Sequence, residues 1–599
     1  MEYLVVISII LIYGSIITIK TKKRIEETIP ISIVCISIII YITGMFNNLK
    51  LGVIIVGIMA MIGIAIILYT LCRQKDSKNS KEILERIITP GAIVYILLCI
   101  LFIALNKGRV FEDYDEFNHW ARIIKNMFLF NSYGINEETI VVFNEYPPFT
   151  AIFQYIFLSI KNVFREDIIL TAQCILYLSV IIPITKNIRW NKSLISLILI
   201  IPSIIFIPVI FYENFYLNIL VDGILGIMFA SLIFTEYEEK DPIFKYIKIF
   251  SLLTILTLTK TSGTALAVLA LIIIIIKMVI DKNKSELKHL CVVTFGVILL
   301  TSIWYIKIDD GVKRWDFEQY IETENKTQED QINIAETFMK VTVLKGNITI
   351  KELSIFIMFL IIICLNFYTL QKARKREDKD YKYYSISMIV SIPIYLVFLL
   401  ITYMTIFDLD EAENLTCLDR YSSTIFLANI IFQLMSIIKF NVKVDIQKVI
   451  ILFTTLIIFL PMQNIATQYI NGKNYIAMSN INRDIYTKFR IYKNRVEKDS
   501  KILFIAGSKA KLAYLKSLNE YESNIFIKEI IVGDFENEKQ LEEIAINYDY
   551  VFIYRIDTEA KNNVCNLFEG SYVNTDTLYK VNQDEGKLKL KIVRNLNER

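Results

Sequence analysis

An acidic segment after the fourth apolar run carries the residue types best suited to moving a proton. It places four carboxylates in five positions, Glu112, Asp113, Asp115 and Glu116, and His119 follows Asp115 by four residues. On a helix this spacing puts Asp115 and His119 on one face. Asp115, with Glu116 beside it, is therefore a candidate general base. The alternative is structural, because Asp113 and Glu116 have the spacing of a capping box at a helix start.

Three further charged residues stand at or near the ends of apolar runs. Asp222 lies within an apolar run, Lys260 lies between two runs, and Arg420 precedes another. An ionisable residue at membrane depth is a functional candidate, although Asp222 also suits a partner on a neighbouring helix. Lys260 and Arg420 are cations at the ends of apolar runs, and the structural alternative to a functional role is snorkelling to the interface for both. Tyr146 suits an interfacial aromatic belt.

The composition indicates which elements position these residues. The chain has 599 residues, of which 54% are hydrophobic, and its mean hydropathy is +0.47. Apolar runs of about 18 residues or more recur along it, each long enough to cross a bilayer as a helix. The net charge of +4 predicts no nucleic-acid surface. Eight scattered cysteines and two histidines predict neither a disulfide framework nor a multi-histidine metal centre.

The apolar runs predict a mainly α, polytopic membrane protein with about 14 transmembrane helices. We expect them near residues 3–19, 30–47, 51–72, 88–106, 168–185, 193–211, 215–235, 244–259, 263–280, 289–306, 351–370, 384–406, 421–440 and 447–464. Lys and Arg concentrate at 20–24, 73–86, 186–192 and 372–376, which predicts a cytoplasmic side. All four share that side only if the run 149–163 lies along the outer interface and does not span. Both termini are then extracytoplasmic.

Three regions follow from this topology. Residues 1–87 form N-terminal helices, and 88–470 form a transmembrane core with outer loops at 107–167, 307–350 and 407–420. Residues 471–599 are expected to form an extracytoplasmic α/β domain. Its strands are predicted at 501–505, 525–532 and 550–553, and its helices at 509–519 and 537–546. Long polar loops on the outer side indicate that the protein works there.

The order of these motifs resembles that of the GT-C glycosyltransferases, in particular the protein O-mannosyltransferases and the aminoarabinose transferases of lipid A. The resemblance rests on five elements in order: Asp115-Glu116, Tyr146-Pro147-Pro148, Leu217 to Gly223 with Asp222, Thr259-Lys260-Thr261, and Asp419-Arg420-Tyr421. It covers about residues 90–440. Two features depart from the pattern: the chain has extra spans before residue 88, and Lys260 is not followed directly by glycine.

The resemblance implies a bacterial cell-membrane enzyme that transfers a sugar from a polyprenyl-phosphate carrier to a cell-envelope acceptor, with inversion. Asp115 would be the base, Arg420 and Lys260 would bind the donor phosphate, and Asp222, His119 and Tyr146 would line the cleft. No cofactor is implied, and metal ligation by His119 is not favoured. Two other functions remain open, a transporter or flippase of lipid-linked saccharides and a non-catalytic envelope-assembly protein.

Overall fold

The computed structural model describes residues 2–73, 77–134, 145–190, 194–309, 326–344, 353–375, 378–440 and shorter stretches between 469 and 595. These shorter stretches are 469, 497, 500, 502–506, 521, 532–533, 548–554, 574, 577–584 and 587–595. The predicted span at 447–464 and the two helices predicted in the C-terminal domain lie outside the described residues.

Helices dominate the described residues, as predicted. They are α1 (Glu2–Thr21), α2 (Ile25–Met45), α3 (Leu49–Arg73), α4 (Ser77–Ile87), α5 (Pro90–Asn106), α6 (Ala121–Phe130), α7 (Phe149–Lys161), α8 (Glu166–Ile181), α9 (Leu197–Phe211), α10 (Asp222–Glu238), α11 (Pro242–Thr257), α12 (Thr261–Ile280), α13 (Lys284–Asp309), α15 (Gln328–Leu344), α16 (Ile355–Arg374), α17 (Lys379–Thr405), α18 (Leu409–Glu413) and α19 (Leu418–Lys439). Short helical turns η1 (Glu116–Trp120), η2 (Ile182–Thr185) and η3 (Leu194–Ser196) complete the set.

Within the described residues, ten helices are long and apolar enough to cross a membrane. They are 2–21, 25–45, 49–73, 79–106, 166–185, 261–280, 285–308, 355–374, 379–405 and 418–439. The predicted spans at 193–211, 215–235 and 244–259 correspond to α9, α10 and α11, which have 15 to 17 residues. Residues 215–221 of the second predicted span are not helical. The architecture is compatible with a multi-pass membrane protein.

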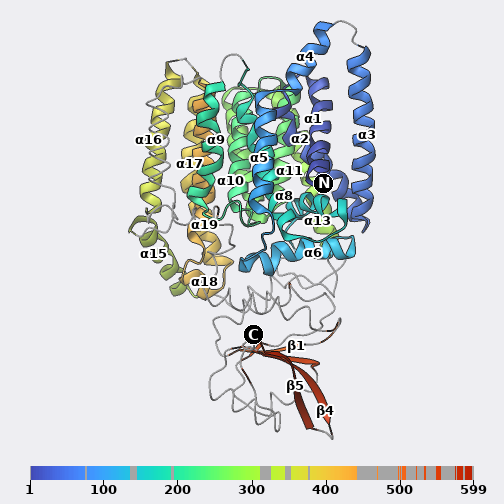
Figure 1. Cartoon of the computed structure of the whole chain (residues 1–599). Helices are drawn as coiled ribbons and strands as arrows, with labels where there is room; N and C mark the ends of the chain where they lie inside the picture. The colour runs from blue at the N-terminus through green and yellow to red at the C-terminus, as the bar shows by residue number, and fades with distance from the viewer. Residues whose placement is uncertain are drawn as a thin grey trace. The chain divides into compact units, whose positions relative to one another are not determined.

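The chain divides into two compact units. The first comprises residues 1–110, 127–135 and 143–472, and the second comprises 111–126, 136–142 and 473–599. In the first unit the helices run side by side as a bundle (Figure 1). At its centre α8 is almost entirely covered, with 94% of its spanning window buried, whereas only 22% of the corresponding window of α3 is buried. Exposed side chains on α3 such as Met61 and Leu68 are apolar, as a lipid-facing surface requires.

Ion pairs show that three of the basic loops share one end of the bundle. Lys23, after α1, contacts Glu239 at 2.7 Å, and Lys186, after η2, contacts Glu238 at 2.7 Å. Lys277 near the end of α12 contacts Asp380, in the first turn after the α16–α17 loop, at 3.0 Å. We call this the basic end. Asp222 marks the opposite end, because α10 runs from Asp222 to Glu238.

Helix α7 begins and ends at the same end of the bundle, as the charge pattern predicts. The Phe149 amide donates to the Leu258 carbonyl at 2.7 Å, and Lys161 pairs with Glu2 at 2.8 Å. Leu258 follows α11 and Glu2 begins α1, both at the end of the bundle away from the basic loops, so α7 starts and finishes at one end. Its burial differs from the expectation of an interfacial helix. Residues 149–158 are all buried, because α1, α2 and α8 cover them.

Within its described residues, the second unit contains a five-stranded mixed sheet with strand order β2-β1-β3-β4-β5. The strands are β1 (Ile502–Ala506), β2 (Val532–Gly533), β3 (Tyr550–Tyr554), β4 (Thr577–Asp584) and β5 (Lys587–Asn595). β2, β1 and β3 are parallel, and β1 and β3 correspond to two of the predicted strands. β2 overlaps the third at Val532, while residues 525–531 lie outside the described residues, and β4 and β5 add an antiparallel hairpin. That hairpin was missed, although Leu588, Leu590 and Ile592 alternate with lysines in the period of a strand.

Candidate functional site

Three of the residues singled out from the sequence meet at the end of the bundle opposite the basic loops. Lys260 Nζ lies 2.9 Å from Asp222 Oδ1, and Arg420 Nε lies 3.4 Å from Asp222 Oδ2. The Asp222 and Lys260 side chains are 6% and 11% exposed, and that of Arg420 is 19% exposed. Neither cation follows the snorkelling alternative, since both turn toward a buried carboxylate. We call these three residues the charge triad.

Each member of the triad comes from the start of a different helix. Asp222 is the first residue of α10, Lys260 immediately precedes α12, and Arg420 lies in the first turn of α19. An acidic residue in the first turn favours a helix N-terminus electrostatically, which suits Asp222. The two cations gain nothing from their helix dipoles, so their placement depends on Asp222.

Close helix packing brings α10 against α19. A Cβ added at Gly226 would lie 2.3 Å from the Thr424 carbonyl oxygen, so only glycine permits this approach. Small residues at helix interfaces are the usual means by which membrane helices come this close. The Tyr212 hydroxyl adds a polar link, because it donates to the Arg420 carbonyl at 2.9 Å and lies 3.0 Å from Thr424 Oγ1.

Aromatic rings border the charge triad. Lys260 Nζ lies 5.3 Å from the ring centroid of Tyr421 and 5.9 Å from that of Tyr146. Arg420 stacks at 5.0 Å on the Tyr421 ring and donates a 3.1 Å hydrogen bond from Nη2 to the Tyr421 hydroxyl. Ring faces attract cations at these distances. Tyr146 and Tyr421 therefore belong to the same cluster as the triad.

Electrostatics keep Lys260 charged. Lys260 stands in the turn between α11 and α12; burial alone would lower its pKa, but the Asp222 carboxylate more than offsets this and raises the pKa well above its ordinary value. Burial also raises the pKa of the Tyr146 phenol well above its ordinary value, with Lys260 opposing the shift. At neutral pH the triad therefore holds two cations and one anion, and its net charge is +1.

Two glutamines that were missed from the sequence position the segment before Asp222. Gln154 Nε2 donates to Gln173 Oε1 at 2.8 Å, and Gln173 Nε2 lies 3.3 Å from the carbonyl oxygens of Ile219 and Leu220. Both glutamines are buried. An amide side chain inside an apolar run was the available signal, since such groups are costly in lipid unless they have partners.

The acidic segment belongs to the second unit. Glu116 begins the π-helical turn η1 and is fully buried. Its Oε2 accepts hydrogen bonds of 2.9 Å from the backbone amides of both Glu112 and Asp113. Asp113 Oδ1 accepts from the Asp115 amide at 2.9 Å. The bond from the Asp113 amide to Glu116 is one of the two hydrogen bonds of the predicted capping box, so Glu116 organises the loop. Asp115 immediately precedes the turn and is half-buried.

His119 lies within the same π turn. It is 2% exposed, and its ring meets the Trp120 ring edge-on at 4.6 Å. Single π turns inside helices occur frequently at functional sites. No group of three His, Cys, Asp or Glu side chains arranged to hold a metal ion occurs in the described part of the chain.

Trp304 donates to the Glu145 carbonyl at 3.0 Å, which gives it a structural partner next to Tyr146.

No protein-family model matches the chain, and neither does any curated protein or solved structure.

Proposed function

We propose that this protein is an integral membrane glycosyltransferase that moves a sugar from a polyprenyl-phosphate carrier to a cell-envelope acceptor, which is a polymer, a glycolipid or a protein. The observation that carries the proposal is the charge triad of Asp222, Lys260 and Arg420. Three of the motifs that resemble GT-C enzymes contribute one residue each to that cluster. A fourth contributes Tyr146, whose ring faces Lys260.

The charge of the triad suits a glycosyl phosphate. A polyprenyl-phosphate sugar is a phosphodiester with a single negative charge, which matches the triad's net charge of +1. When the carrier leaves as a phosphate monoester, its charge grows toward about −2 at neutral pH. Cations fixed in advance by Asp222 stabilise that developing charge without reorganising during the reaction. Arg420 has the planar donor geometry that binds phosphate oxygens in pairs.

The proposed reaction is a direct displacement. The acceptor hydroxyl oxygen bonds to the anomeric carbon, the bond from that carbon to the phosphate oxygen breaks, and its electron pair leaves with the carrier. Asp115 takes the hydroxyl proton as general base. Glu116 is engaged by two backbone amides, so the proposal gives it the task of shaping the loop that holds Asp115. A single displacement inverts the anomeric centre, whereas retention needs a second, nucleophilic carboxylate.

The proposed membrane arrangement follows the charges. The basic end faces the cytoplasm, which puts the charge triad on the outer side, where lipid-linked sugars are used by this class of enzyme. In this arrangement the core is GT-C-like with about 14 spans, both termini are extracytoplasmic, and the C-terminal sheet belongs to an outer domain. No metal or other cofactor enters the reaction.

The test uses the full chain in nanodiscs, with a polyprenyl-phosphate sugar donor and native envelope acceptor. Asp115→Asn is expected to bind the donor normally and to lose about 10²- to 10⁴-fold in transfer rate, because only the base is removed. Lys260→Met is expected to weaken donor binding itself. Lys240→Met is the matched control, since Lys240 is exposed and lies at the basic end.

Undiminished transfer by Asp115→Asn would refute the base, and normal donor binding by Lys260→Met would refute the phosphate site. Wild-type protein that moves lipid-linked sugar between leaflets without transferring it would favour a flippase. Wild-type protein that neither transfers nor moves the donor would favour an assembly protein.

A further inference from the structure

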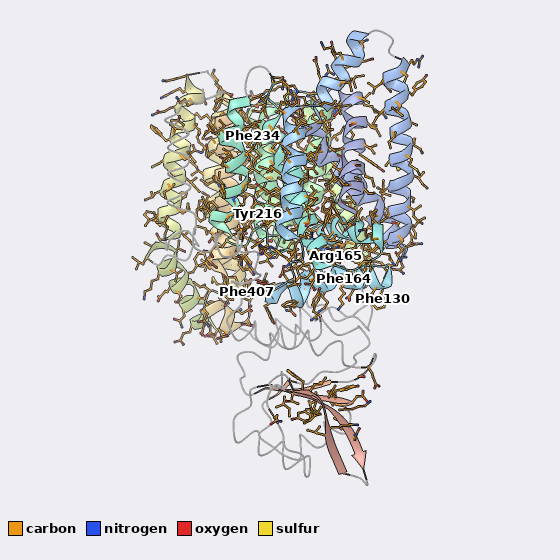
Figure 2. The ribbon with its side chains drawn as sticks, in the orientation of Figure 1. Phe130, Phe164, Arg165, Tyr216, Phe234 and Phe407 are labelled. Carbon is orange, nitrogen blue, oxygen red and sulfur yellow. The ribbon has the colours of Figure 1, made fainter. Side chains whose placement is uncertain are left out.

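A pocket lies at the basic end of the bundle, between α2, α8, η2, α10, α11 and α19, with an empty volume of about 460 Å³ including its open mouth. Its polar lining includes Lys186, Ser231, Glu238 and Lys248. Phe234, another lining residue, lies toward the opposite end of the bundle from Arg165 and Phe407 (Figure 2). The Phe407 ring in turn lies 6.0 Å from that of Tyr421, beside the charge triad. The pocket is thus remote from the proposed transferase site.

Lys248 is the unusual member of this pocket. It is only 7% exposed, and it makes no ion pair or hydrogen bond within the described residues. The ring centroid of Phe244 lies 5.9 Å from Lys248 Nζ. The adjacent lysine on the same helix, Lys245, is paired with Glu236 and Glu286. A buried cation without a direct ion pair is costly, so an anion bound in the pocket would stabilise Lys248.

The other polar groups limit what that anion is. Lys186 contacts both Glu27, at 3.3 Å, and Glu238, at 2.7 Å, and neither of these carboxylates makes an ion pair with Lys248. Glu238 at the pocket wall disfavours a multiply charged anion. Ser231 Oγ is buried and has no hydrogen-bond partner within the described residues, so it is available as a donor. These groups together suit a singly charged anion that also accepts a hydrogen bond.

The walls and the location point to a lipid. Most of the remaining lining is apolar, with Ile184, Leu252 and Met435 among its residues. Basic pockets between transmembrane helices on the cytoplasmic side are typical sites for anionic lipid headgroups. A lipid phosphodiester carries a single negative charge, whereas inorganic phosphate near neutral pH is partly doubly charged.

We propose that this pocket binds the phosphodiester headgroup of an anionic membrane lipid, with Lys248 as its counter-ion and Ser231 as a hydrogen-bond donor. The site is separate from the proposed transferase centre, because Asp222 and Glu238 stand at opposite ends of α10, about 24 Å apart along a helix of 17 residues. Binding here therefore does not depend on the transferase proposal, and it extends the molecule's lipid contacts to the other leaflet.

The experiment titrates short-chain phosphatidylglycerol into the purified full chain in maltoside detergent. Native mass spectrometry counts retained lipid, and the thermal midpoint reports stabilisation. Lys248→Met is expected to weaken lipid binding by about tenfold or more, whereas Lys248→Arg keeps the cation and most of the affinity. Lys240→Met, at the same end but exposed and outside the pocket lining, is expected to bind as the wild type does.

A separate arm replaces the lipid with inorganic phosphate. Lys248-dependent stabilisation by phosphatidylglycerol alone supports the proposal, and equal stabilisation by inorganic phosphate would overturn the lipid as the ligand. Unchanged lipid binding by Lys248→Met would overturn the site altogether. Without added lipid, Lys248→Met is expected to be at least as stable as the wild type, because it removes a buried charge; this guards against misfolding as an explanation of lost binding.

Discussion

Lys260 and Asp222 stand 38 positions apart in the sequence, yet Lys260 Nζ and Asp222 Oδ1 are 2.9 Å apart in a buried part of the bundle. Arg420 approaches the other carboxylate oxygen of Asp222 at 3.4 Å. Asp222 is thus the anion that the starts of α12 and α19 both face.

Asp222→Asn is expected to destabilise the protein strongly. The substitution leaves Lys260 and Arg420 facing a neutral amide in a buried position, and breaking a buried pair from one side costs about 3–5 kcal/mol. Thermal unfolding in detergent measures the effect. The double variant Asp222→Asn with Lys260→Met is expected to recover part of the loss, because it also removes one of the two cations that Asp222→Asn leaves unpaired. A double variant that is less stable than Asp222→Asn would contradict this account.

Glu116→Gln is expected to loosen the acidic loop. The carboxylate accepts hydrogen bonds from the Glu112 and Asp113 amides, and bonds to a charged group contribute about 1.5–3 kcal/mol against about 0.5–1.5 for neutral ones. Hydrogen exchange of those two amides should accelerate in Glu116→Gln and more so in Glu116→Ala. Asp115→Asn should leave their exchange close to wild type while it lowers transfer. Equal loosening by Asp115→Asn and Glu116→Gln would argue that both carboxylates are structural.

Donor binding is expected to be insensitive to pH between about 7 and 10. The pKa of Lys260 is raised by Asp222, so the contribution of its charge is complete below the ordinary lysine value of about 10.4 and is lost only as the pH rises through the elevated folded-state value. Equilibrium binding of a polyprenyl-phosphate sugar from pH 7 to about 11 measures it. A wild-type affinity that falls by half near pH 10.4, where an ordinary lysine is half deprotonated, would show that Lys260 titrates normally and is not paired in solution.

Gly226→Ala is expected to impair both stability and transfer. Its Cβ would lie 2.3 Å from the Thr424 carbonyl oxygen, so α10 and α19 must separate, and Asp222 moves away from Arg420. Gly57→Ala is the matched control, because a Cβ there meets no atom within 4 Å. Thermal midpoints and transfer rates of the two variants provide the comparison. If both variants behave alike, close α10–α19 packing does not determine the geometry of the triad.

The sequence by itself determined most of the apolar helices. An apolar run of about 18 residues must satisfy its backbone internally in lipid, so each predicted span from 3–19 to 421–440 falls on a helix, whereas α4, α15 and α18 were not predicted. The clustering of lysines also predicted that Lys23 and Lys186 share one end of the bundle. These are local properties of the chain, which composition and charge reveal without knowledge of neighbours.

Only the tertiary structure decided which charged residues meet. Lipid-facing and core-facing positions of a membrane helix are both apolar, so the sequence carries little periodic signal for which face of α10 packs on α19. That packing depends on Gly226 and Thr424, and it converts Asp222, Lys260 and Arg420 from three separate candidates into one cluster. Likewise, the sequence left open whether Glu116 is a capping residue or a partner of Asp115 in catalysis, and only the folded loop shows that its carboxylate accepts hydrogen bonds from two backbone amides.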